Sequence, residues 1–166
     1  MSQGKKAVDT FLSMLDDSEL NIYKQIINLF YEYGYVPQHK SKTKGLIISF
    51  SNLEHNRAIA NMGVREGSAK PFFGLRFSSC KDYPQKFADI VRDRILSSNN
   101  RLAKCSECRF CKGDKFTYTY KFPDGKIKVA CGAFILEIPD ITADDIAEIK
   151  KLFQEQHKHF MEHYVV

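Results

Sequence analysis

The chain has 166 residues, 43% of them apolar, and a net charge of +5. This length suits a single domain with a real core, and the balance of apolar and charged residues excludes the disordered class. We find no run of about 18 apolar residues, which excludes a transmembrane helix, and the five clustered or odd cysteines favour a cytoplasmic protein over a secreted disulfide scaffold.

The first half of the chain predicts two helices and then three strands. Apolar residues recur at helical spacing over 5–15, and again from Asp16 or Asp17 to a glycine stop at Gly34. The segments 46–50, 57–64 and 71–78 are rich in β-branched and aromatic residues, as strands are. Their short connections favour an antiparallel meander.

The second half predicts a helix, a hairpin and a last helix. Pro84 suits a helix start, and an apolar stripe follows it to Ser97. The turn Pro123-Asp124-Gly125 joins predicted strands 116–122 and 126–137, and Thr142 begins a capping box for a helix that runs to Tyr164. The order ααβββαββα predicts one α+β domain over 1–166, with an antiparallel sheet of about five strands and 105–131 as a cysteine-rich loop and hairpin sub-unit.

The cysteines are the clearest candidate site. Three stand at C-x2-C-x2-C spacing, and the hairpin register would bring a fourth beside them, opposite Thr117. Thiolates are strong, soft metal ligands, and four of them suit tetrahedral zinc. The sequence therefore predicts a zinc site formed by Cys105, Cys108, Cys111 and Cys131, with Cys80 as an alternative ligand.

Other roles for these cysteines stay open. An iron–sulfur cluster uses the same spacing with a remote fourth cysteine, although Gly132 stands where a proline usually follows. Cys105 and Cys108 might otherwise form a redox pair, or all of the cysteines might be free thiols. Cys80 precedes a helix start, which could lower the pKa of its thiol, but a small buried apolar group is the commoner role.

The middle of the chain is strongly basic. Residues 38–131 carry nineteen Lys and Arg against eight acids, and both flanking segments are acidic. This pattern favours either a surface for an anionic partner or a basic sheet covered by acidic helices. Nearby aromatics would suit a nucleic acid strand, and the candidate nucleic-acid-binding residues are Lys40, Lys42, Lys44, Arg101, Lys104, Arg109, Lys112 and Lys115.

A small-molecule pocket between sheet and helices is a third candidate site, although the same aromatics would equally form a core. Its candidate walls are Phe50, Phe72, Phe73, Phe77, Tyr118 and Tyr120. We find no phosphate-binding glycine loop and no nucleophile elbow, and a closed quartet of cysteines leaves no open metal position. The expected function is therefore binding, of a small molecule or a protein partner, by a zinc-stabilised domain and not catalysis; nucleic-acid binding and redox or metal handling are the alternatives.

The layout also resembles known small proteins. Two helices, a meander ending in Lys70-Pro-Phe-Phe-Gly-Leu-Arg-Phe77 and a following helix resemble small bacterial domains grouped with frataxin-like proteins. The cysteine trio, the 123–125 hairpin and Cys131-Gly132 resemble cysteine-bearing proteins of anaerobic bacteria. The resemblance implies an α+β fold and a bacterial cytoplasm, and it implies no activity.

Overall fold

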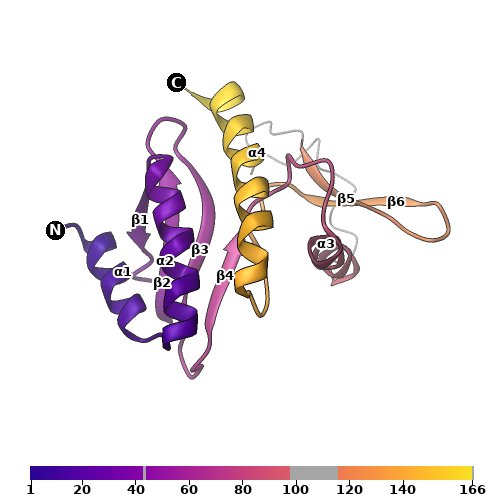
Figure 1. Cartoon of the computed structure of the whole chain (residues 1–166). Helices are drawn as coiled ribbons and strands as arrows, with labels where there is room; N and C mark the ends of the chain where they lie inside the picture. Colours follow the sequence, from indigo (N-terminus) through magenta and orange to yellow (C-terminus); the bar gives the residue numbers. More distant parts are fainter. Residues whose placement is uncertain (43, 98–115, 166) are drawn as a thin grey trace.

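The computed structural model describes residues 1–42, 44–97 and 116–165 and confirms the α+β class (Figure 1). The described helices and strands, in chain order, are α1 (Gln3–Ser13), α2 (Asp17–Glu32), β1 (Tyr35–His39), β2 (Gly45–Asn52), β3 (Arg57–Arg65), β4 (Pro71–Leu75), α3 (Gln85–Ser97), β5 (Thr117–Lys121), β6 (Ile127–Cys131), β7 (Leu136–Glu137), the 3-10 turn η2 (Ala143–Asp145) and α4 (Ile146–Tyr164). None of the helices in these ranges is long and apolar enough to cross a membrane.

Local sequence signals set the helix ends. Asp16 caps α2 by accepting a hydrogen bond from the backbone N–H of Glu19, and the Glu19 side chain accepts in return from the backbone N–H of Asp16. This reciprocal capping satisfies donors that a helix start leaves free. Just beyond the other end, Gly34 takes φ +77°, a left-handed conformation that favours glycine.

The main sheet has five antiparallel strands in the order β1-β2-β3-β4-β7. The predicted meander forms β2, β3 and β4 of this sheet. Two details differ from the prediction: Tyr35–His39 forms an additional edge strand, and the 123–125 hairpin makes a separate two-stranded sheet of β5 and β6. Only β7, at the end of predicted strand 126–137, joins the main sheet.

One aromatic core joins the sheet to α2 and α4. The Phe30 ring on α2 lies 5.0 Å from the Phe50 ring of β2 and 5.1 Å from the Phe153 ring of α4, and all three side chains are fully buried. Close-packed aromatic pairs of this kind add stabilisation beyond the apolar area that they bury. The described part of the fold is therefore centred on the interface between the sheet and these two helices.

The β5–β6 hairpin lies beyond the β7 end of the sheet and projects away from the rest of the molecule (Figure 1). Helix α3 packs against both of its strands and against β7. At the base of the hairpin, the Tyr118 hydroxyl donates to the Phe134 carbonyl at 2.7 Å and accepts from the Phe77 backbone N–H at 3.1 Å. These bonds fix the hairpin to the loop that follows β4.

That loop, Arg76–Cys80, is buried along its whole length. Buried loops need partners for their backbone polar groups, and here separate elements supply them. The Ser78 hydroxyl donates to the Gly132 carbonyl at 2.8 Å, and Gln156 on α4 accepts from both the backbone N–H and the hydroxyl of Ser79. The loop thus ties the sheet, the hairpin and α4 together.

Candidate functional site

The β5–β6 hairpin is the described segment with the most exposed positive charge in a projecting position. Its turn forms as the sequence predicts: Phe122 donates its backbone N–H to the Lys126 carbonyl, and Asp124 accepts from the Lys126 N–H at 2.9 Å. Gly125 takes φ +82° with open space around it. The predicted register is also confirmed, because Thr117 pairs with Cys131.

Alternation along the two strands gives the hairpin two unlike faces. One face carries Tyr118 and Ala130, which are buried toward the body, and further out the rings of Tyr120 and Phe122, whose centroids lie 4.9 Å apart. The opposite face is exposed and is formed by two cross-strand pairs, Thr119 with Val129 and Lys121 with Ile127. The Ile127 side chain is 66% exposed, which is unusual for a large apolar residue at the surface.

The exposed lysines of the hairpin are Lys121, Lys126 and Lys128. Asp124 is the only acid between residues 116 and 132, and within the described ranges no ion pair joins any of the three lysines to a carboxylate. The Lys128 ammonium lies 5.4 Å from the centre of the Phe122 ring. Because these ammonium groups are solvated and uncompensated by the neighbouring structure, they form a positive patch that is available to an anion.

The structure separates this patch from the basic residues predicted from the sequence. Lys40, Lys42 and Lys44 are exposed between β1 and β2, at the opposite edge of the main sheet from β7 and the hairpin. The other five candidates lie outside the described residues: Arg101, Lys104, Arg109, Lys112 and Lys115. The described part of the basic middle is thus two separate patches and does not form one surface.

The predicted function, a zinc-stabilised binding domain, is wrong on the described part of the chain. Over residues 1–42, 44–97 and 116–165 there is no group of three or more His, Cys, Asp or Glu side chains that could hold a metal ion. Cys80 and Cys131 are both free cysteines there. Cys105, Cys108 and Cys111 lie outside the described residues, so an iron–sulfur cluster at this spacing stays a prediction.

Cys80 has the surroundings of a structural residue. Only 4% of it is exposed, and its thiol donates to the Leu152 carbonyl of α4 at 3.5 Å. Burial, with the charge of Glu155, raises the pKa of the Cys80 thiol, the reverse of the lowering that a helix start could produce. A buried, protonated thiol is neither a good nucleophile nor a good ligand. The commoner role, a small buried apolar group, therefore fits the structure.

The predicted pocket aromatics lie mainly in the core. Phe50, Phe73, Phe77 and Tyr118 are fully buried, and they pack on other rings, as Phe77 does on Tyr118 at 5.0 Å. Tyr120 is half-buried on the hairpin. Phe72 differs, because its partly buried ring lines a surface pocket with the start of α2.

Sequence reasoning missed the hairpin lysines as a group. It weighed lysines in loops and assigned the hairpin to the proposed metal site. The available signal was Lys121, Lys126 and Lys128 placed around a strong turn with a single acid between them. Chemically, this arrangement can bind anions, since its ammonium groups are donors and no described neighbour supplies a catalytic partner.

No family model, no curated protein and no solved structure matches the chain.

Proposed function

We propose that this protein binds nucleic acid, and duplex DNA in particular, through the β5–β6 hairpin. The carrying observation is the projecting two-stranded ribbon with three exposed lysines and one acid. The major groove of B-DNA is about 12 Å wide and admits a two-stranded β-ribbon. A cytoplasmic location, as the cysteine usage predicts, belongs to the same proposal.

The side chains divide the work of binding. Lys121, Lys126 and Lys128 would contact phosphates, which supply affinity and position the protein. The outward pair Thr119 and Val129, with Ile127, would face base edges, where methyl groups favour thymine. The described hairpin carries no Arg, Asn or Gln, the usual readers of guanine and adenine. We therefore expect weak sequence specificity and strong salt dependence.

The base of the hairpin supports its role as a rigid reader. Tyr118 is fully buried and hydrogen-bonded to the backbone on two sides, and a Cβ at Gly132 would overlap the Phe116 carbonyl. Preorganised elements lose less entropy on binding than mobile ones. The ribbon would accordingly dock as a unit.

Fluorescence anisotropy with a labelled duplex tests the proposal. Three phosphate contacts predict a slope of roughly −3 for log K against log salt, so affinity should fall about fortyfold between 50 and 200 mM salt. The triple variant Lys121→Gln, Lys126→Gln, Lys128→Gln should flatten this slope nearly to zero.

A matched variant, Lys40→Gln, Lys42→Gln, Lys44→Gln, removes the same charge at the opposite edge of the sheet and should leave the slope unchanged. Equal weakening by both triple variants would reject the hairpin as the interface. Absence of binding at 50 mM salt would reject nucleic acid as the partner.

A further inference from the structure

A second site is present far from the hairpin in sequence and chemistry. A pocket of about 380 Å³ lies between the start of α2, the β3–β4 turn with β4, and the segment 137–142. This volume is at the small end of the range for small-molecule sites. Its apolar wall is formed by Ile22, Phe72 and Ile138.

Tyr23 provides a buried polar group at this pocket. The residue is only 3% exposed, its ring packs edge-on against Phe11 at 5.0 Å, and its hydroxyl has no hydrogen bond within the described residues. Burial first, and then the charges of Glu19 and Glu137, raise the pKa of the Tyr23 hydroxyl. Both of those carboxylates line the same pocket, so the hydroxyl lies on the pocket side of the ring. A buried hydroxyl without a partner is costly, and a ligand would satisfy it.

The charge around the pocket is negative. Glu19, Glu137 and Asp140 line it, against Lys70 in the lining and Arg65 behind it, which leaves a net charge of −1. Arg65 already binds both oxygens of Glu137, at 3.2 and 2.6 Å. The Lys70–Asp140 contact is 4.0 Å long with both side chains almost fully exposed, so it contributes little. Glu19 and Asp140 therefore remain available to a cation.

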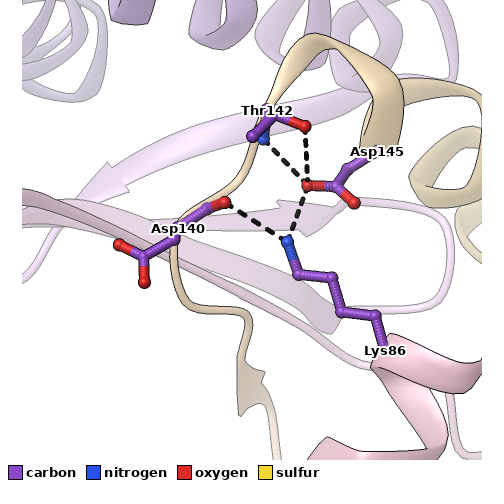
Figure 2. A network of polar contacts seen from close by, with 4 residues as sticks. All are labelled: Lys86, Asp140, Thr142 and Asp145. Atoms are coloured by element: carbon purple, nitrogen blue, oxygen red, sulfur yellow. Dashed lines mark hydrogen bonds and ion pairs between the residues drawn. The ribbon is translucent and has the colours of Figure 1, made fainter.

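One wall of the pocket is held in place from behind (Figure 2). Asp145 Oδ2 accepts from Lys86 Nζ at 2.7 Å and from the Thr142 backbone N–H at 2.8 Å, and the Asp140 carbonyl accepts from the same Lys86 ammonium at 3.3 Å. Asp140 takes φ +48°, which is uncommon for a residue other than glycine. Figure 2 shows the Asp140 carboxylate directed away from Lys86, so this network fixes the loop without consuming that charge.

We propose that this pocket binds a small organic ammonium, with the cation between Glu19 and the Tyr23 hydroxyl and a short apolar body against Ile22 and Phe72. A primary ammonium has three N–H donors, and the pocket offers carboxylate and phenol oxygens to accept them. The apolar wall then separates an amine with a hydrocarbon chain from an inorganic cation. This site is independent of the nucleic-acid proposal.

An NMR titration with hexylamine tests the site, with hexanol as the neutral probe and hexanoate as the anionic one. We expect saturable shifts at the backbone amides of Glu19, Tyr23 and Thr142, with a Kd of about 1–10 mM for so small a ligand. Hexanol and hexanoate should bind at least about tenfold more weakly. Equal binding of hexanol would overturn the ammonium class, and an absence of saturable shifts at these amides would overturn the site.

Two variants locate the cation. Tyr23→Phe and Glu19→Gln should each weaken hexylamine binding by roughly threefold or more. Glutamine serves as well as glutamate in a capping box, so Glu19→Gln should keep α2 intact. Glu54→Gln removes an exposed carboxylate far from the pocket lining and should leave the Kd unchanged. Unchanged binding in both pocket variants would overturn the assignment.

Discussion

The Tyr35 hydroxyl donates its hydrogen to Nδ1 of His157, and the direction of this bond is fixed from the other end of a buried chain. His55 Nδ1 accepts from the Arg57 backbone N–H at 3.1 Å, so the hydrogen of neutral His55 lies on Nε2. That Nε2 donates to the Tyr35 oxygen at 3.2 Å, and the Tyr35 hydrogen is left for His157, also at 3.2 Å. The chain links the turn after β2 to α4 through the first residue of β1.

Tyr35→Phe should destabilise the protein by about 1–3 kcal/mol, because it leaves the buried His55 Nε2 donor without a partner. Urea unfolding measures the loss. Tyr31→Phe is the matched control, since Tyr31 is 39% exposed, and it should change stability by less than about 0.5 kcal/mol. Equal effects of the two variants would show that the chain contributes nothing to stability.

The free energy of unfolding should fall as the pH drops from 7 to 5. Burial, and then the neighbouring charges of His157, Arg57 and Arg76, lower the pKa of His55 from 6.5 to about 4. The unfolded chain therefore binds the extra proton first, and the contribution of His55 is present above pH 6.5 and lost toward pH 4. For this one group the loss between pH 7 and pH 5 is about 2 kcal/mol.

Burial also lowers the pKa of His157, so its contribution has the same sign. The measurement is the difference in pH dependence between the parent protein and His55→Gln, followed by urea unfolding at each pH. His163→Gln, at an exposed position of α4, should retain the parent slope. An unchanged slope in His55→Gln would contradict the assignment to His55.

Gly4→Ala should destabilise the protein although alanine is the better helix former. In an open helix position this change would gain about 1 kcal/mol. Here Gly4 is buried where α1 crosses β1, and a Cβ would overlap the carbonyl group of Pro37. We expect a loss of about 1–3 kcal/mol in urea unfolding. Thr10→Ala, on the exposed side of α1, is the control, and a stabilised Gly4→Ala variant would disprove this close contact.

Features that depend on neighbours in sequence were predictable. The Asp16 cap, the Gly34 stop and the 123–125 turn each act over a few residues, and the turn fixed the pairing of Thr117 with Cys131. The strand at Tyr35–His39 was missed because Pro37 lacks a backbone donor and so reads as a break. At the edge of a sheet a proline is tolerated, and β1 is such an edge.

Features that depend on distant residues were not predictable from spacing. The amine pocket joins Tyr23 to Glu137, which no periodicity connects, and Phe72 lines it while the neighbouring Phe73 is core. The burial of Arg76–Cys80 likewise depends on α4 and on Gly132. The cysteine spacing suggested zinc because the metal hypothesis needed only short-range geometry, whereas its test required the surroundings of each thiol.

Gln156→Leu should weaken the junction between α4 and the buried loop. Gln156 is fully buried, and its Oε1 accepts from the Ser79 N–H at 2.9 Å and from the Ser79 hydroxyl at 3.0 Å. Leucine fills the space but leaves the Ser79 N–H buried without a partner, which costs about 1–3 kcal/mol. Ser79→Ala is the matched control: it removes only the hydroxyl and keeps the backbone bond, so its cost should be smaller. Hydrogen exchange separates the two, because the amide of residue 79 should exchange faster in Gln156→Leu and stay protected in Ser79→Ala. Equal protection in both variants would mean that Gln156 does not hold the loop.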